Sequence, residues 1–270
     1  MVDTRANYGG TIPEYYDRYL GPAWFDAFGA ELVRRLDGGV VGDMLEIACG
    51  TGLVTRRLHE RVDPARRLVA SDVSQPMLEY ARTALSDCGG IEWREADAAR
   101  LPFEGGEFRA VVCAFGMMFV PDKRAAFREA HRVLERGGTF LFSVWDRIEE
   151  NPAAAINAEV IEGLFPGDAE VRFRTPYEMH DPEPLRQSLH EAGFREVRIE
   201  RMRIEVDGIS AREIALGQIH GSPRSLLLEK RGVSLDDVVE RVSVALAKVG
   251  GADPWRGPAR ALVVEARADA

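Results

Sequence analysis

The segment 45–52, which reads Leu-Glu-Ile-Ala-Cys-Gly-Thr-Gly, combines the residue types that a nucleotide site needs at a turn. An apolar run precedes it and a helical pattern follows, so it is expected to connect a strand to a helix. Gly50 and Gly52 would let the backbone turn sharply and let a ligand approach the main chain closely. Asp72 closes the next apolar run, 20 residues after Gly52. A carboxylate in that place can accept both hydroxyl groups of an adenosine ribose.

Two further residues distinguish the class of nucleotide. A dinucleotide fold requires the pattern G-x-G-x-x-G, because the helix N-terminus must receive a pyrophosphate. Here Thr55 stands at the third glycine position, and the carboxylate of Glu46 stands just before the turn. An acid beside a pyrophosphate would repel it, whereas an acid beside an ammonium or sulfonium group would attract it. The sequence therefore favours an adenosine with a cationic, amino-acid-like tail and disfavours a nicotinamide-dependent oxidoreductase.

These residues must be positioned by the elements around them, which alternate between short apolar runs and amphipathic helical stretches. That rhythm is typical of βαβ units and predicts a parallel sheet in an α/β domain. A helix is expected from about 122 to 135, with Asp122 as its cap and Gly137 and Gly138 ending it. A bulge is expected near Arg201 in the sixth strand. Seven strands are expected in all, at 40–48, 67–72, 91–96, 108–115, 139–145, 195–206 and 261–266.

Two segments interrupt this rhythm. Residues 151–182 are rich in proline and read as irregular, while 209–249 read as two helices broken around 221–223. We interpret the chain as a single domain, 1–270, with an N-terminal helical lid at 1–36. The interrupting segments, taken as 151–182 and 209–250, are interpreted as insertions that cap the substrate. Their apolar and aromatic residues favour a small apolar or aromatic molecule over a polymer.

The balance of charged residues argues against some classes of binding partner. The chain has 270 residues, and its 35 basic and 44 acidic side chains give a net charge of −9. Without a basic excess to displace counterions from phosphates, nucleic acids and anionic membranes are not expected as partners. The three cysteines lack metal-ligand spacing, so neither a disulfide framework nor a metal site is expected. No apolar leader or membrane span is apparent, and the expected location is the cytoplasm. The oligomeric state is left open, with a homodimer among the options.

Taken in order, these motifs resemble those of class I S-adenosylmethionine-dependent methyltransferases that act on small molecules (the methyltransferase type 11 group). The similarity covers roughly 15–208 together with the closing strand. It implies a Rossmann-like, doubly wound, seven-stranded and mostly parallel sheet, S-adenosylmethionine as the cofactor and a small-molecule acceptor. The methyl group would pass to an oxygen, nitrogen or carbon atom, mainly through proximity and in-line alignment. The alternative kept open is an enzyme with the same fold and cofactor pocket that performs a non-methylating reaction on a natural-product intermediate.

The resemblance also implies which residues hold the cofactor. Residues of the first motif would surround its methionine part, Asp72 its ribose, and the residues after Asp72 and around Asp97 its adenine. An aromatic residue of the N-terminal segment and one leaving the fourth strand would cover it. The implied set is Tyr16, Glu46, Ala48, Gly50, Gly52, Asp72, Val73, Met77, Asp97, Ala98 and Phe115.

Two residues are expected at the substrate. Trp145 ends the fifth predicted strand, and His220 lies at the break between the inserted helices. As a hypothesis, His220 would be a general base for a hydroxyl acceptor, because histidine titrates near neutrality. No catalytic residue is otherwise identified, since methyl transfer from a sulfonium needs a base only when the acceptor must lose a proton.

Overall fold

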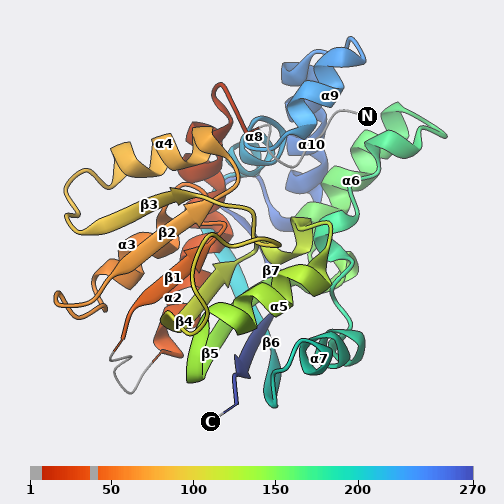
Figure 1. The fold of residues 1–270 in the computed structure, drawn as a ribbon. Coiled ribbons are helices and arrows are strands. Elements are labelled where there is room, and N and C mark those ends of the chain that lie inside the picture. The colour runs from red at the N-terminus through yellow and green to blue at the C-terminus, as the bar shows by residue number, and fades with distance from the viewer. Residues whose placement is uncertain (1–7, 37–41, 270) are drawn as a thin grey trace.

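The computed structural model describes residues 8–36 and 42–269, and within these residues seven strands form one sheet (Figure 1). The strand order is β3-β2-β1-β4-β5-β7-β6, and β7 alone runs antiparallel to its neighbours. The predicted doubly wound, seven-stranded and mostly parallel sheet is therefore confirmed. The strands are β1 (Met44–Ile47), β2 (Leu68–Asp72), β3 (Ile91–Glu95), β4 (Phe108–Ala114), β5 (Leu134–Trp145), β6 (Glu196–Ile209) and β7 (Trp255–Arg267).

Helices cover both faces of this sheet, and the period-two pattern of the central strands explains why. Met44 and Val112 point to the face covered by α2 (Asp26–Arg34) and α3 (Leu53–His59). Leu45, Val111 and their neighbours point to the other face, which is covered by α5 (Lys123–Val133) and α7 (Pro182–Glu191). Helix α4 (Gln75–Ala84) packs on β2 and β3. Strand order reverses between β1 and β4, so the crevice beyond their carboxyl ends is the expected ligand site.

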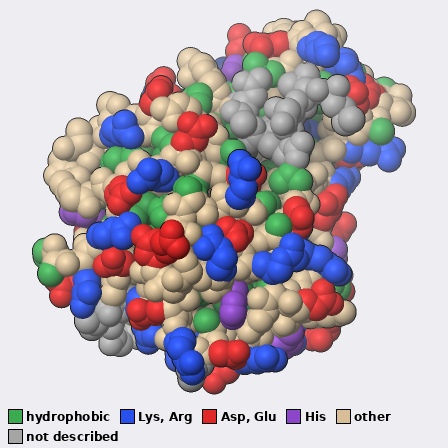
Figure 2. Space-filling view, in the orientation of Figure 1, with side chains coloured by type: hydrophobic (Ala, Val, Ile, Leu, Met, Phe, Trp, Pro, Cys, Tyr) green, Lys and Arg blue, Asp and Glu red, His purple; other side chains and the backbone are tan. Residues whose placement is uncertain are grey.

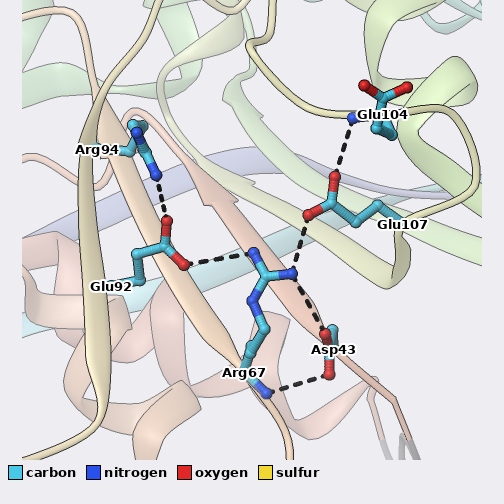
Figure 3. A network of polar contacts seen from close by, with 6 residues as sticks. All are labelled: Asp43, Arg67, Glu92, Arg94, Glu104 and Glu107. Atoms are coloured by element: carbon cyan, nitrogen blue, oxygen red, sulfur yellow. Dashed lines mark hydrogen bonds and ion pairs between the residues drawn. The ribbon is translucent and has the colours of Figure 1, made fainter.

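The amino ends of the strands are joined by an exposed ion network instead (Figure 3). Arg67, directly before β2, pairs with Glu107 at 2.9 Å and with Glu92 of β3 at 3.3 Å. Its backbone N–H also donates to Asp43, directly before β1, at 3.1 Å. Exposed pairs of this kind each contribute little to stability. The network thus lies at the edge of the sheet opposite the carboxyl ends, away from the expected ligand site.

A group of further helices lies beyond the carboxyl ends of the strands. Figure 1 shows α6, α8, α9 and α10 gathered at the end of the molecule where the described chain begins. The chain begins there with α1 and a π-helix, η1, which contains Pro22. The bounds are α1 (Ile12–Tyr15), η1 (Tyr16–Phe25), α6 (Pro152–Leu164), α8 (Ala211–His220), α9 (Arg224–Lys230) and α10 (Leu235–Gly250). Four single 3₁₀ turns complete the part of the chain that the structure describes: η2 (Met117–Phe119), η3 (Ile148–Glu150), η4 (Ala169–Val171) and η5 (Thr175–Tyr177).

Helices η1 and α8 lie in direct contact because two residues of α8 and its cap lack side chains. A Cβ added to Gly217 would lie 2.6 Å from the Leu20 side chain. A Cβ added to Gly221 would lie 2.9 Å from the backbone nitrogen of Tyr16. Real Cβ atoms do not approach other atoms so closely. The N-terminal helices and the inserted helices therefore form one continuous layer over this end of the sheet.

The inserted segments contain more helix than the sequence predicts. Residues 152–164 form α6 rather than irregular structure, because Pro152 stands at the first helical position, where no N–H is needed. Residues 209–249 contain three helices, not two. Gly232, with φ of +74°, follows the end of α9, and the Ser234 hydroxyl accepts the Asp237 N–H at 3.3 Å to cap α10.

Two strand predictions also need correction. Helix α5 begins at the predicted Asp122 cap, which accepts the Ala125 N–H at 2.9 Å, but it ends at Val133. Strand β5 starts at once, so Gly137 and Gly138 lie within an irregular strand and do not end the helix. The register of β6 is continuous past Arg201 and shifts only between 206 and 209. The predicted bulge near Arg201 is therefore wrong.

The surface of the molecule mixes both signs of charge. In Figure 2, acidic and basic side chains are interspersed over the described part of the visible face. None of the helices within 8–36 and 42–269 combines the length and apolar character needed to cross a membrane.

Candidate functional site

A cavity of about 810 Å³ lies at the carboxyl ends of β1, β2 and β4, beneath the N-terminal and inserted helices. This volume is within the range of small-molecule and cofactor sites. The cavity lies at the switch point of strand order that the topology indicates. The predicted site residues that line it are Tyr16, Ala48, Gly50, Asp72, Val73, Met77, Asp97, Ala98, Phe115 and Trp145.

Three predicted site residues are not among the lining residues. Glu46 lies behind the turn, 1% exposed, and its Oε2 accepts the Thr55 hydroxyl at 2.6 Å. Gly52 faces the helix α4 side of the turn. His220 stacks its ring on Tyr15 at 4.7 Å, and burial lowers the pKa of its imidazole. Because this placement does not bring His220 to the cavity, we assign it no proton-transfer role.

The backbone at the cavity floor is held in a conformation that side chains disfavour. Ala48 and Phe115, at the ends of β1 and β4, have φ of 55° and 56°. Such strain clusters at functional sites and costs of the order of 1–3 kcal/mol at each residue. Gly50 also has a positive φ, of +54°, and a Cβ built on it would meet no atom within 4 Å. Since Gly50 lines the cavity, this open space is room for a ligand against the main chain.

Asp72 joins the end of β2 to this turn. Its Oδ2 accepts the Gly50 N–H at 2.9 Å and its Oδ1 accepts the Ser74 N–H at 2.8 Å. Burial raises the pKa of the carboxyl, and these backbone hydrogen bonds partly offset that rise. Each oxygen retains a lone pair, so the carboxylate can still accept two hydroxyl groups.

Apolar side chains line the cavity beside Asp72. Val73, 45% exposed, is one of the few large hydrophobic side chains left exposed on the described surface, and it lines the cavity together with Met77 and Ala98. Asp97 lies at the same edge, and its Oδ1 accepts the Ala99 N–H at 2.9 Å. An apolar slot with a hydrogen-bonding carboxylate at its edge fits a planar heterocycle with an exocyclic amine.

Aromatic side chains form a large part of the remaining lining. Phe115 and Trp145, from the ends of β4 and β5, have ring centroids 4.3 Å apart. Phe25 of η1 packs on Phe115 at 5.2 Å, and Tyr177 of η5 stacks on Trp145 at 6.3 Å. Aromatic faces attract cationic groups and provide a dry surface for an apolar molecule. The aromatic residues lining the cavity are Tyr8, Tyr16, Trp24, Phe25, Phe115, Phe119, Trp145, Phe173 and Tyr177.

The ionisation of Glu46 differs from the expectation of an anion facing the ligand. Burial raises the pKa of this carboxyl to about 8, against a lowering by the Thr55 hydrogen bond. Near pH 7 the carboxyl is therefore largely neutral in the ligand-free protein. In the sequence, Thr55 and Glu46 are two separate arguments against a dinucleotide ligand. In the structure they form one buried hydrogen-bonded pair behind the turn.

Replacing Glu46 by glutamine should make the protein more stable than wild type at alkaline pH. In the unfolded protein the Glu46 carboxyl has a pKa near 4.5 and loses its proton above that pH. In the folded protein the carboxyl keeps its proton up to a pH of about 8. The wild-type contribution is therefore full below pH 4.5 and is lost as the pH rises toward 8, by at most about 1.4 kcal/mol per pH unit. Urea unfolding at pH 5, 6.5 and 8 measures the difference between variant and wild type. A difference that does not grow with pH would contradict the buried, protonated state, and the exposed Glu79→Gln serves as control.

Several lining residues were not predicted as site residues. Tyr8 and Trp24 come from the N-terminal segment, whose aromatic content was the available signal. Asn157 of α6, Arg172 and Arg224 come from the inserted segments. Nothing local in the sequence indicates them, because only the packing of distant segments brings them to one cavity.

Comparisons with known proteins agree with this geometry. A family profile described as "Methyltransferase domain" matches residues 44–138. The chain is 41% identical over 101 residues to the ubiquinone/menaquinone biosynthesis C-methyltransferase UbiE of Hahella chejuensis, and this stretch is 36% of this chain and 41% of that protein. The chain thus spans about two fifths of that relative's length. It is 31% identical over 181 residues to UbiE of Shewanella sp. (strain MR-4), covering 62% of this chain and 71% of that protein.

A solved structure shares the fold over nearly the whole chain. It is phosphoethanolamine N-methyltransferase 2 of Haemonchus contortus in complex with S-adenosyl-L-methionine. The TM-score is 0.62 at 17% identity, covering 98% of this chain and 59% of that one.

Proposed function

The chain belongs to the class I S-adenosylmethionine-dependent methyltransferases, and we propose that it methylates a carbon atom of a small, largely apolar or aromatic acceptor. One observation carries the proposal: a single cavity has a nucleoside-type end at Gly50 and Asp72 and an aromatic end at Trp145. The relatives named above as C-methyltransferases support carbon as the methylated atom.

The residues present fit the cofactor. Gly50 leaves open space at the main chain, Asp72 has free lone pairs for the ribose hydroxyls, and Val73 and Met77 offer an apolar slot for adenine. Tyr16, Ala48, Asp97, Ala98 and Phe115 complete the proposed contacts, while Glu46 and Gly52 act from behind the turn. When bound, S-adenosylmethionine supplies an activated methyl group.

The protein's own contribution is orientation and exclusion of water. The aromatic wall would hold the acceptor's ring and keep the site dry, so the reacting atoms stay close and aligned. Among the described residues, those lining the cavity include no histidine. We therefore propose that the acceptor reacts as its enolate or phenolate, formed by loss of an acidic proton to bulk water as it enters, and that no histidine base takes part.

We also propose the roles of the covering segments. Residues 1–36 form the lid, of which 1–7 lie outside the described residues, and 151–182 and 209–250 form the substrate cap. Lining residues from all three segments support this division. A homodimer and a cytoplasmic location remain predictions.

Methyl-labelled S-adenosylmethionine tests the function directly. The protein is incubated with a panel of hydroquinones, phenols and enolic acids, and labelled product and S-adenosylhomocysteine are measured. We expect transfer to carbon in at least one apolar aromatic member. Binding of S-adenosylhomocysteine without turnover of any member would contradict the proposed acceptor class, and absence of binding would contradict the cofactor site.

Replacing Trp145 by alanine should lower kcat/KM for the best acceptor of that panel by about tenfold to hundredfold. The change removes the surface on which Phe115 and Tyr177 pack, so the acceptor loses its aromatic wall. Steady-state kinetics measures the effect. Trp93→Ala, a half-buried tryptophan of β3 outside the cavity, is the matched control, and an equal loss in both variants would contradict the assignment.

A further inference from the structure

We propose that the acceptor carries an oxyanion of the carboxylate class, and that the guanidinium of Arg224 binds it. The inference rests on the proposed function, because it names a property of the molecule that fills the acceptor end of the same cavity. It follows from the distribution of charge along the cavity, the surroundings of Arg224 and an unsatisfied amide oxygen nearby.

The charged residues that line the cavity are separated along it. Asp72 and Asp97 lie at the ends of the adjacent strands β2 and β3, where the cofactor is proposed to bind. Arg172 and Arg224 come from the inserted segments. The carboxylate of Glu170, which also lines the cavity, is neutralised by Arg231 at 2.5 Å. Lys123, at the start of α5, also lines the cavity, and its ammonium group donates to the Val120 carbonyl at 3.1 Å. The acidic end suits a cationic cofactor, and the end formed by the insertions suits an anion.

Arg224 is held in place but its charge is not compensated. Its Nη2 donates to the Val171 carbonyl at 3.3 Å, and its guanidinium lies 5.3 Å from the centroid of the Phe173 ring. The nearby Glu162 is paired instead with Arg174 at 3.0 Å. Within residues 8–36 and 42–269, no carboxylate comes within ion-pair distance of Arg224, so most of its five N–H donors are available.

Burial lowers the pKa of Arg224 to about 10, which leaves the side chain charged at neutral pH. A cation in this position is partly desolvated and lacks a carboxylate partner. Such a group is stabilised when an anion binds beside it, and guanidinium geometry matches a carboxylate with two parallel hydrogen bonds.

An amide in the same cavity indicates a second polar group on the acceptor. Asn157 is 3% exposed and its Oδ1 has no hydrogen-bond donor. Its orientation is fixed by a chain of hydrogen bonds. Gln218 Nε2 donates to the Ala153 carbonyl at 3.1 Å, so its Oε1 accepts from Asn157 Nδ2 at 2.8 Å. The free Asn157 oxygen therefore calls for a donor on the ligand, such as a hydroxyl group.

Together these groups describe an acceptor with an aromatic or apolar body, one carboxylate and one hydroxyl or N–H donor. The apolar walls bind the body, Arg224 binds the anion, and Asn157 accepts from the donor. A hydroxyl group next to the methylated carbon would also activate that carbon as a nucleophile.

A matched pair of fluorescent probes tests the anion site. 8-Anilinonaphthalene-1-sulfonate and N-phenyl-1-naphthylamine share one aromatic skeleton, and only the first carries an oxyanion. Both are titrated into the full chain saturated with S-adenosylhomocysteine, which fills the cofactor end. We expect the wild type to bind the sulfonate at least about tenfold more tightly than the neutral probe.

Three variants test whether Arg224 causes the preference for the sulfonate probe. Arg224→Met should weaken sulfonate binding by about tenfold to hundredfold and change neutral-probe binding less than twofold. Arg224→Lys should retain part of the preference. Arg212→Met removes the same charge from an exposed residue of α8 that does not line the cavity and pairs with Glu240 at 3.1 Å, and it should leave both affinities unchanged.

The inference is overturned if the wild type shows no preference, or if Arg212→Met and Arg224→Met weaken sulfonate binding equally. Should Arg224→Met not fold, the wild-type preference and the lysine variant decide the question. Calorimetric binding of S-adenosylhomocysteine is measured on the same samples. Its absence in wild type would reject the proposed function, whereas its presence without probe discrimination would reject the oxyanion site alone.

Discussion

Replacing Gly50 by alanine should remove most of the cofactor affinity and leave the fold intact, whereas the same change at Gly52 should mainly lower the stability of the protein. A methyl group on Gly50 would meet no protein atom and would occupy the space proposed for the ligand. A methyl group on Gly52 would lie 2.5 Å from Leu85 and 3.3 Å from Ala81. The two glycines of one turn are therefore required for different reasons.

The expected sizes follow from those contacts. Both residues have positive φ, so each alanine costs about 1–2 kcal/mol of backbone strain. Overpacking at Gly52 adds to this and gives a loss of about 2–4 kcal/mol in unfolding free energy. At Gly50 the added methyl group would clash with the ligand instead of with the protein. This clash should weaken S-adenosylhomocysteine binding by about tenfold to hundredfold.

Titration calorimetry and urea unfolding of both variants measure these effects. Gly90→Ala is a matched control for strain alone, because Gly90 has φ of +81°, no neighbour within 4 Å and no contact with the cavity. Unchanged binding in Gly50→Ala would contradict the open space as the cofactor position.

Replacing Asp72 by asparagine should weaken S-adenosylhomocysteine binding by about 100-fold or more. The amide has one acceptor oxygen, whereas Asp72 now accepts the Gly50 and Ser74 N–H groups on different oxygens. An amide N–H would face one of those donors, and the charged hydrogen bonds to the ribose would be lost. The loss combines a distorted turn with a missing ligand contact.

Calorimetry with S-adenosylhomocysteine, together with adenosine as a smaller probe, measures this effect. Asp63→Asn is the control, because Asp63 also accepts a backbone N–H, that of Ala65 at 2.9 Å, on an exposed turn. If Asp72→Asn bound as tightly as the control variant, Asp72 would not be the ribose ligand.

The sheet and the cofactor turn could be predicted because their signals are local. The nearly continuous apolar run of a buried strand such as β4 and the glycine turn after β1 depend on a few neighbouring residues. Asp72 and Gly50 meet in the structure because they lie at the carboxyl ends of the adjacent parallel strands β2 and β1. The spacing of Glu46 predicted a charged side chain beside the ligand. Spacing alone does not show that Thr55 covers the Glu46 carboxyl.

The acceptor end could not be predicted in this way. Arg224 reaches the cavity only because α9 packs near the 3₁₀ turn at Val171, about fifty residues earlier in the chain. His220 stands only a few residues away but stacks on Tyr15 instead. These two residues are neighbours in sequence but have different surroundings, because each side chain's direction depends on its position in the helical turn and on the packing of distant segments. Residue type alone predicts neither. The prolines of 151–182 predicted irregular structure where α6 forms, because proline occurs at helix starts as well as at breaks.

The close contact of η1 with α8 bears on how molecules are exchanged during turnover. Because Gly217 and Gly221 let these helices lie against each other, the segment carrying Tyr16 cannot be displaced far without disturbing the start of the segment carrying Arg224. Departure of the spent cofactor and release of the methylated product are therefore expected to share one opening motion rather than to proceed through independent gates.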